Sequence, residues 1–382
     1  MVPMTVGVFL PVFFALLLLS AMGKAQAQPA WAGRMEAGLA ALNEAAGPQQ
    51  AGVYVRDLDT GESAGVHVDE RWYLASTVKV PIAIAVLRAV ERGRLTLDTA
   101  VPLHAVDTVD GGGSTNRRAA GARIPVRRLM EQMIIHSDNT ASDLLIGTVG
   151  IDAVNAVVAS LVPRGFGRIT SLADVRRAVY GGLDPAASRL AGPDFLQLHA
   201  LPDDTARLER FAQIAEVPLS SLRLPTLDAA YDRYYASGLN TARLDAYADL
   251  LQALAQGRAL GPVTTDYLLG LMGRIATGRH RVTAGLPPTV AFAHKTGTQR
   301  RRICDSGIVR VDRADAPTPQ RVVLVACVRD APSLARAEGA LRQVGELLCR
   351  SGLITKGVPD APTCHAAVGA RSLPASSQRA VR

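Results

Sequence analysis

Residues 76–91 read STVKVPIAIAVLRAVE. From Thr77 to Glu91 the chain is apolar on nearly every side, which predicts a helix buried inside the protein rather than one on its surface. Pro81 fits such a helix because it falls near the first turn, where few backbone amides donate hydrogen bonds. We therefore expect a molecule built around one central apolar helix.

Strand patterns lie towards both ends of the chain, far from this helix. Residues 51–58 and 65–68 alternate like a strand pair around the turn Asp59-Thr60-Gly61. Further strands are expected over residues 289–298, 303–311 and 321–328, and helices over residues 34–46, 125–135, 141–148, 241–256, 264–277 and 333–348. This order predicts an α+β fold with one antiparallel sheet built from N- and C-terminal strands and flanked by helices, plus an all-α region from the middle of the chain.

The first 27 residues have the pattern of a signal peptide. An apolar run of about a dozen residues precedes Ala25-Gln26-Ala27, whose small side chains suit cleavage. The run is well short of the roughly 20 residues that span a bilayer, so we expect no stable membrane anchor after cleavage. The predicted location is periplasmic or secreted. Residues 28–355 are expected to form one domain, with an insert at about 165–227 and a loose tail at 356–382.

Composition narrows the class of partner. With 48% apolar residues and 20% charged residues among 382, the chain can bury a sizeable core. Its net charge of +8 favours anionic small molecules or the cell envelope, because no motif of a nucleic-acid-binding module is present. None of the seven histidines has the spacing of a metal-ligand motif, so neither a metal nor another cofactor is expected.

Four cysteines lie in the last fifth of the chain, at positions 304, 327, 349 and 364. In an oxidising compartment they allow two disulfides by any of three connectivities, and free buried thiols are the alternative. Cys304 and Cys327 fall at symmetric distances from the middle of the expected hairpin. This symmetry favours a cross-strand bridge between them, which leaves Cys349 to pair with Cys364.

The start of the buried helix carries a nucleophile and a base. Ser76 and Lys79 are three residues apart, a spacing that places two side chains on the same helix face. A serine hydroxyl attacks well only when a neighbour takes its proton, and a buried lysine with a lowered pKa can do so. Only four of the 42 basic residues are lysines, and two of these are Lys79 and Lys295. A chance occurrence of this common pattern is the alternative.

Two further polar motifs follow in the chain. Ser137-Asp138-Asn139 falls in the break between two expected helices, where Asp138 also suits a helix cap. Lys295-Thr296-Gly297-Thr298 ends the first C-terminal strand, and its glycine lets another backbone or a ligand approach closely.

Ser-x-x-Lys, Ser-Asp-Asn and Lys-Thr-Gly in this order resemble the signature of class A β-lactamases and penicillin-binding proteins. The resemblance implies a β-lactamase/transpeptidase-like fold in which Ser76 attacks an amide carbonyl and Ser137 relays a proton to the leaving nitrogen. It also implies an oxyanion hole made by the backbone amides of Ser76 and Thr298. The expected substrate-binding residues are Asn139, Lys295, Thr296, Gly297 and Thr298.

The chain departs from class A enzymes at the residue that releases the acyl group. Those enzymes carry a Glu-x-x-Leu-Asn loop, and no such string occurs between Asn139 and Lys295. Asp228, in Asp228-Ala-Ala-Tyr-Asp232, is the nearest substitute for the deacylation base, although its carboxylate is one methylene shorter. Glu209 is a remoter candidate, and an ordinary loop aspartate is the alternative reading of Asp228.

Three functions fit these motifs. The first is an exported β-lactamase that opens β-lactam rings through an acyl-enzyme on Ser76. The second is a D-alanyl-D-alanine peptidase or esterase of the same fold that acts on peptidoglycan. The third is a penicillin-binding sensor that acylates without turnover, which the missing glutamate favours. In each case the partner is a small β-lactam or a peptidoglycan-derived substrate, and a monomer is expected.

Overall fold

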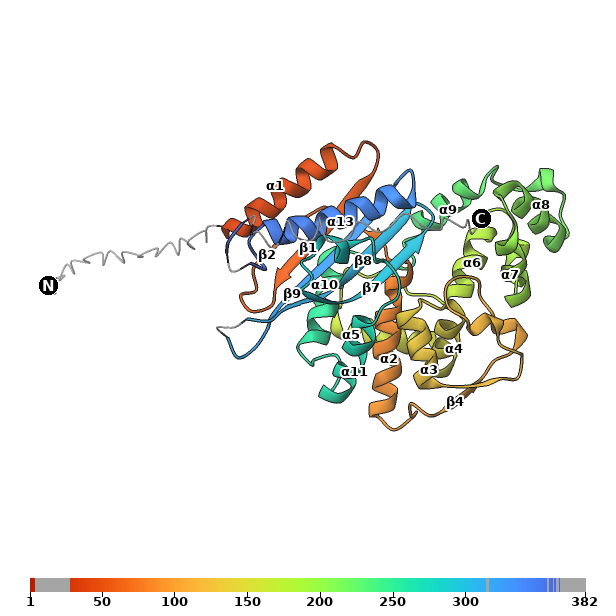
Figure 1. Cartoon of the computed structure of the whole chain (residues 1–382), viewed down its shortest axis with the longest axis horizontal. Helices are drawn as coiled ribbons and strands as arrows, with labels where there is room; N and C mark the ends of the chain where they lie inside the picture. Colours follow the sequence, from red (N-terminus) through yellow and green to blue (C-terminus); the bar gives the residue numbers. More distant parts are fainter. Residues whose placement is uncertain (4–27, 314–315, 356, 360, 362–363, 365–382) are drawn as a thin grey trace.

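The computed structural model describes residues 1–3, 28–313, 316–355, 357–359, 361 and 364. Its main sheet has five antiparallel strands in the order β2-β1-β9-β8-β7 (Figure 1). The strands are β1 (Gln50–Asp57), β2 (Ser63–Val66), β7 (Ala291–Gln299), β8 (Arg302–Val311) and β9 (Gln320–Arg329). Because β1 pairs with β9, the two ends of the chain close one sheet, and the predicted α+β architecture is confirmed.

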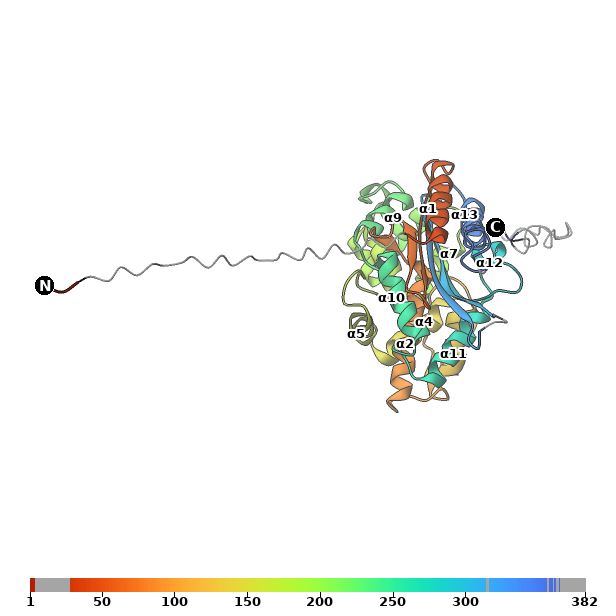
Figure 2. The same ribbon diagram turned by 90° about the vertical axis from the view of Figure 1, so that its left-hand side faces the viewer.

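The sheet is covered on both faces. Helices α1 (Ala30–Glu44) and α13 (Leu334–Arg350) pack on one face, and α10 (Leu244–Ala255) packs on the other, as the side view of Figure 2 shows for α13 and α10. Side chains of β9 alternate between the two cores. Val322 and Leu324 belong to the core under α1 and α13, whereas Val323 and Val325 belong to the opposite core. This period of two is what the strand geometry requires.

The central apolar stretch begins with the short 3-10 helix η1 (Ala75–Val78) and continues as α2 (Lys79–Glu91). Nearly every residue of α2 is buried, as its composition predicts. The surrounding helices are α3 (Val126–Ile135), α4 (Asn139–Val149), α5 (Ile151–Leu161) and α11 (Pro262–Gly273). Short elements complete this part: β3 (Trp72–Tyr73) with β6 (Thr241–Ala242), β4 (Ala100–Pro102) with β5 (Arg123–Pro125), η2 (Ala105–Asp107) and η3 (Thr115–Arg117). The short helix α12 (Val282–Gly285) packs against α13 instead.

The region from α6 to α9 forms a helical unit at one end of the molecule (Figure 1). It contains α6 (Leu172–Gly181), η4 (Pro185–Arg189), α7 (Gly192–Ala200), α8 (Asp204–Ala215), η5 (Leu219–Ser221) and α9 (Leu227–Ala236). Its buried apolar side chains form a third core, separate from the two that flank the sheet. The expected insert at 165–227 is therefore packed mainly around its own apolar residues, together with Tyr73 and Ala75 beside Ser76, and this packing extends through α9.

The interpretation of Asp228-Ala-Ala-Tyr-Asp232 as a loop is wrong, because these residues belong to α9. Thr226 caps the helix by accepting a hydrogen bond from the Ala229 amide at 3.1 Å. Leu227, Ala230 and Tyr234 are buried at a helical spacing. The cap and the apolar stripe together make the helix.

Both disulfides join the cysteines that the hairpin symmetry favours, so the preferred connectivity is confirmed. Cys304 of β8 and Cys327 of β9 are directly opposed in the sheet and are bonded to each other. Cys349 at the end of α13 is bonded to Cys364. Free thiols are thereby excluded for all four cysteines.

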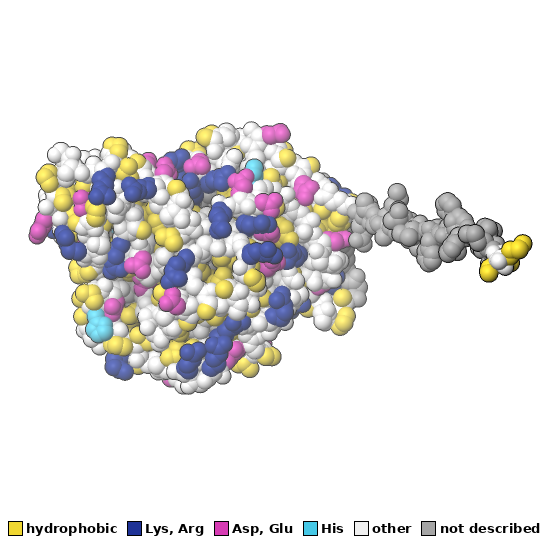
Figure 3. All heavy atoms as spheres, turned by 180° about the vertical axis from the view of Figure 1, so that it is seen from behind, with side chains coloured by type: hydrophobic (Ala, Val, Ile, Leu, Met, Phe, Trp, Pro, Cys, Tyr) yellow, Lys and Arg dark blue, Asp and Glu magenta, His cyan; other side chains and the backbone are white. Residues whose placement is uncertain are grey.

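Some expectations fall outside the described residues: residues 4–27 of the predicted signal peptide and most of the tail at 356–382. Within the described ranges no single helix is long and apolar enough to cross a membrane, although α4 and α5 would pass that test if taken together across their 85° bend. On the face drawn in Figure 3, basic and acidic side chains are interspersed over most of the surface.

Candidate active site

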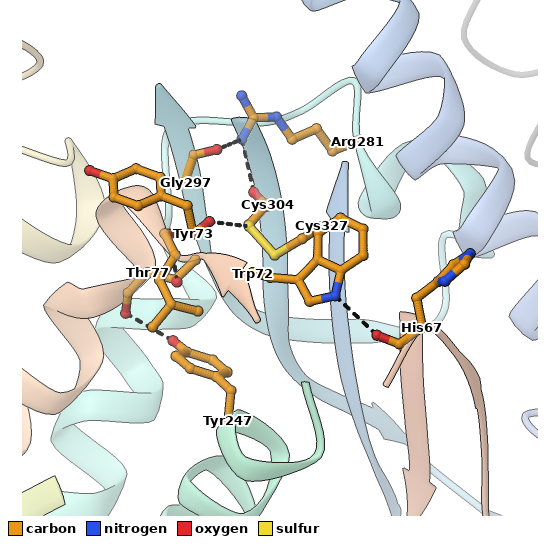
Figure 4. Close-up of a disulfide and its surroundings, with 10 residues drawn as sticks. His67, Trp72, Tyr73, Thr77, Tyr247, Arg281, Gly297, Cys304 and Cys327 are labelled. Carbon is orange, nitrogen blue, oxygen red and sulfur yellow. Dashed lines mark hydrogen bonds between the residues drawn. A yellow bond between two sulfur atoms is a disulfide. The ribbon is translucent and has the colours of Figure 1, made fainter. Parts of the chain in front are cut away.

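Ser76 lies in η1, at one side of a cleft of about 640 Å³. Strand β7 passes so close to this segment that a Cβ atom on Gly297 would lie 2.5 Å from the Leu74 carbonyl oxygen, which explains the glycine. From the opposite side, the Tyr247 hydroxyl of α10 donates to the Thr77 carbonyl oxygen at 2.9 Å (Figure 4). The segment that carries Ser76, the predicted nucleophile, is thus held from two sides.

Lys79 is fully buried behind the cleft, with 0% of its surface exposed. Its Nζ donates to the Ser137 carbonyl oxygen at 2.6 Å, to Asn139 Oδ1 at 2.7 Å and to Ser137 Oγ at 3.3 Å. Lys79 Nζ and Ser76 Oγ both belong to the described residues, and they are not hydrogen-bonded to each other. Burial lowers the pKa of Lys79 to about 7, against the weaker opposing effect of Asp138 and Asp143. The amine is therefore poised to exchange a proton near neutral pH.

Ser137 is shared by two buried amines. Lys295 Nζ donates to Ser137 Oγ at 3.0 Å, and Lys295 is also 0% exposed. Burial lowers the pKa of Lys295 well below its ordinary value, and the nearby Lys79 and Arg281 lower it further. Ser137 has a φ of +59°, a strained value for a residue with a side chain, and the bond from Lys79 to its carbonyl oxygen helps to hold it. Two lysines far apart in the sequence thus meet at one hydroxyl.

The Ser-Asp-Asn motif is held by a loop that the sequence analysis did not single out. Asp138 caps α4 through the Ala141 amide at 2.9 Å, as expected, and it also accepts from the Ser114 and Thr115 amides at 2.8 Å each. Asn139 Nδ2 donates to the Asp110 carbonyl oxygen at 2.6 Å. The signal for this loop was the run Gly-Gly-Gly at 111–113.

The glycines at 111 and 113 are required by close approach to the motif. Both have positive φ, and a Cβ atom on Gly111 would lie 2.4 Å from Asn139 Nδ2. A Cβ atom on Gly113 would lie 2.1 Å from Asp138 Oδ2. Larger residues would displace the side chains that position Ser137.

Thr296 and Thr298 of β7 line the cleft, opposite Ser137 and Asn139. Thr298 Oγ1 accepts from Arg281 Nη2 at 2.7 Å, while Arg281 Nη1 donates to the carbonyl oxygens of Gly297 at 3.0 Å and Cys304 at 3.1 Å (Figure 4). Arg281 is 3% exposed, so its charge lies directly beneath the cleft wall. It precedes a four-residue helix, and no motif in the sequence marks it.

The structure does not bring Asp228 to this group. Its carboxylate is half exposed, forms an ion pair with Arg300 and is absent from the cleft lining. Arg300 also binds Asp204 at 2.5 Å, so this arginine ties α8 and α9 to the turn after β7. Glu209 is exposed and does not line the cleft.

One carboxylate does line the cleft, that of Asp110. Arg176 of α6 holds it through two hydrogen bonds, from Nε at 2.7 Å and from Nη2 at 2.9 Å. Both side chains are mostly buried, with exposures of 13% for Arg176 and 8% for Asp110. This pair joins the α6–α9 region to the loop that positions Asn139. In the described ranges no group of three His, Cys, Asp or Glu side chains could hold a metal ion.

Curated relatives of the chain include β-lactamases and a regulatory protein. Beta-lactamase L2 of Stenotrophomonas maltophilia is 36% identical over 151 residues, which cover 38% of this chain and half of that protein. The β-lactamase regulatory protein BlaB of Streptomyces cacaoi is 29% identical over 309 residues, which cover 77% of this chain and 90% of that protein.

Solved structures of a β-lactamase and of PBP-A have the same fold as this chain. A β-lactamase from Sphaerobacter thermophilus has a TM-score of 0.61 at 26% identity and covers 84% of this chain and 98% of its own. A point mutant of PBP-A, solved as an acyl-enzyme complex with penicillin G, has a TM-score of 0.61 at 23% identity and covers 83% of this chain and 95% of its own. A family model described as "Beta-lactamase enzyme family" matches residues 34–351. The chain therefore belongs to the β-lactamase enzyme family.

Proposed function

We propose that the protein is an exported serine hydrolase that opens β-lactam rings by forming an acyl-enzyme on Ser76. One observation carries the proposal: Ser137 Oγ accepts hydrogen bonds from both Lys79 at 3.3 Å and Lys295 at 3.0 Å, beside the cleft that Ser76 lines. A hydroxyl between two amines is suited to pass a proton, and the lowered pKa of Lys79 makes one of these amines a base at neutral pH.

In the proposed reaction, Lys79 Nζ accepts the Ser76 proton while Oγ bonds to the lactam carbonyl carbon. This requires Nζ to turn from its present acceptors towards Ser76 once substrate is bound, and catalytic contacts commonly tighten at that stage. The backbone amides of Ser76 and Thr298 stabilise the oxyanion. The carbon–nitrogen bond then breaks, and the proton passes through Ser137 Oγ to the lactam nitrogen. Water finally hydrolyses the ester and frees Ser76.

Export is part of this proposal. Residues 1–27 would be removed as a signal peptide, and the mature chain would act in the periplasm or outside the cell. The two disulfides support this location, because disulfides persist in oxidising compartments. The mass of the protein recovered from a periplasmic extract or culture medium tests it, with cleavage after Ala27 as the expected result.

A second candidate is a penicillin-binding sensor that forms the same adduct and releases it slowly. A specific observation favours it, because the one carboxylate of the cleft lining is held by Arg176 and is not free to activate water. The similarity to BlaB, a β-lactamase regulatory protein, points the same way.

One experiment separates the candidates. The mature protein is mixed with benzylpenicillin, ring opening is followed by absorbance, and intact mass spectra are recorded over time. Turnover with a transient adduct supports a β-lactamase, and a persistent adduct without turnover supports a sensor. Hydrolysis of a D-alanyl-D-alanine peptide with little lactam turnover would instead show a peptidase, and the absence of any adduct would refute the proposal.

A further inference from the structure

The cleft continues beyond the catalytic residues to a wall made by α6, α7, α8 and α9. This helical wall consists of Tyr180, Phe195, Leu198, Arg207, Leu227 and Tyr231. It combines apolar surface with a few polar groups, which is the usual composition of a small-molecule site. None of these residues takes part in the proposed acylation chemistry.

Two tyrosine hydroxyls of the helical wall have no hydrogen-bond partner within the described residues. Tyr180 is 7% exposed, and its ring packs against Phe211 with the centroids 5.0 Å apart. Burial raises the pKa of Tyr180, and it raises the pKa of Tyr231 in the same way. Both hydroxyls therefore stay protonated at neutral pH and can donate to a ligand that enters the cleft.

Arg207 adds unused donors beside them. Its Nη1 donates to Asp204 Oδ1 at 3.2 Å and its Nη2 to the Leu201 carbonyl oxygen at 2.9 Å, while Nε is buried and has no acceptor among the described residues. Asp204 is shared, because Arg300 also binds it. A guanidinium has five N–H donors, so Arg207 is under-supplied with acceptors.

More positive than negative side chains line the whole cleft. Arg176, Arg207, Arg300 and Arg301 all lie on its surface, whereas Asp110 is the one carboxylate in the lining. The other acids that pair with these arginines, among them Asp204 at 35% exposure, are absent from the cleft lining. A ligand in the cleft therefore meets hydrogen-bond donors and positive charge.

We propose that the helical wall is a subsite for the acyl side chain of the substrate, and that it selects side chains carrying a carboxylate next to an apolar group. Phe195, Leu198 and Leu227 provide the apolar contact. The hydroxyls of Tyr180 and Tyr231 and the guanidinium of Arg207 provide donors for the carboxylate, and hydrogen bonds to a charged group are the stronger kind. This inference rests on the proposed acylation of Ser76.

Two penicillins that share one nucleus test the subsite. Carbenicillin differs from benzylpenicillin by one carboxylate on the acyl side chain, so the ratio of their second-order acylation rate constants isolates recognition of that group. Rates are measured by intact mass spectrometry at equal concentrations and low salt. We expect the wild-type ratio of carbenicillin to benzylpenicillin to exceed one, and we expect Tyr180→Phe and Arg207→Gln each to lower it about tenfold.

Arg210→Gln is the matched control, because Arg210 lies on the same helix but does not line the cleft, and it should keep the wild-type ratio. Tyr180→Phe removes one oxygen atom and preserves the ring packing, so it decides the question if Arg207→Gln fails to fold. A wild-type ratio at or below one overturns the subsite, as does an unchanged ratio in both cleft variants. If the wild-type protein forms no adduct with either penicillin, the proposed function itself is overturned. This outcome differs from failure of the subsite alone, in which both adducts still form.

Discussion

The two ends of the cleft differ in how deeply their charged side chains are buried. At the catalytic end, Lys79 and Lys295 are 0% exposed and share the Ser137 hydroxyl. At the helical wall, the charge is that of Arg207, which keeps partial contact with solvent at 27% exposure in its pair with Asp204. Complete burial lowers the pKa of an amine, whereas a partly exposed guanidinium stays charged. The buried amines suit the proposed proton transfer, and the charged guanidinium suits the proposed recognition of a carboxylate.

The difference also concerns how each end depends on the rest of the protein. The predicted catalytic residues lie on segments that pack against the core formed by α2 and one face of the sheet. A substitution there should therefore affect both the sheet and α2. The α6–α9 region has a core that it shares with Tyr73 and Ala75 beside Ser76, and it meets the loop of Asp110 through the Arg176–Asp110 pair. Four substitutions test whether the two ends of the cleft depend on different contacts.

Ser76→Ala should have the largest effect, because it removes the atom that forms the proposed ester. We expect the penicillin adduct to disappear and acylation to fall by about a thousandfold or more. Intact mass spectrometry measures both. Ser188→Ala, at an exposed serine away from the cleft, is the control and should retain the adduct. A mass shift that survives in Ser76→Ala would show that another residue is the nucleophile.

Lys79 should give the catalytic end a pH dependence. Its amine accepts a proton only when neutral, so acylation should rise as the pH increases through about 7 and then level off. Lys79→Met, which roughly preserves the buried volume, should slow acylation about a hundredfold and abolish this rise. The measurement is the second-order acylation rate constant from pH 5 to pH 9. A wild-type profile that is flat over this range would contradict the assignment of Lys79 as the base.

Arg176→Met should break the link between the two ends. It leaves the Asp110 carboxylate, which is 8% exposed, without its main partner, and loss of one member of a buried pair typically costs about 3 kcal/mol of unfolding free energy. Urea denaturation measures the change. Arg168→Met, at a surface pair with Asp152, is the matched control and should cost less than about 1 kcal/mol. Equal losses in the two variants would show that the Arg176–Asp110 pair is not a special link.

Asp228→Asn should have the smallest effect. The residue is half exposed, pairs with Arg300 and does not itself line the cleft, so we expect a change in stability below about 1 kcal/mol and an unchanged rate of adduct decay. Asp232→Asn on the same helix is the control. Time-resolved mass spectrometry measures the decay, and a selectively longer adduct lifetime in Asp228→Asn would restore this residue as the deacylation base.

Some of this architecture could be predicted residue by residue. The helix after Ser76, the strands β1 and β9 and the pairing of Cys304 with Cys327 follow from local sequence patterns and hairpin symmetry. Helix α5 (Ile151–Leu161) has no counterpart among the expected helices, and Asp228 was expected in a loop but lies in α9. In α9 the deciding signals were the Thr226 cap and the spacing of Leu227, Ala230 and Tyr234.

The supporting residues of the site could not be predicted from local patterns. Arg281, Asp110 and Arg176 lie outside the three motifs and act through contacts with distant segments. The glycine run at 111–113 was a visible signal, but the sequence did not show what it packs against. In the structure, Cβ atoms added at Gly111 and Gly113 would collide with Asn139 and Asp138.

The sequence alone was enough to predict the strands of the main sheet, the central buried helix, the three motifs and a preferred cysteine pairing, because each depends on residue types at short spacing. Only the tertiary structure decided that Ser137 lies between Lys79 and Lys295, that Asp228 pairs with Arg300, and that the α6–α9 region forms the far wall of the cleft. The physical reason is that hydrogen bonds and pKa values depend on distance and burial, and both are set by segments that meet only in the folded chain.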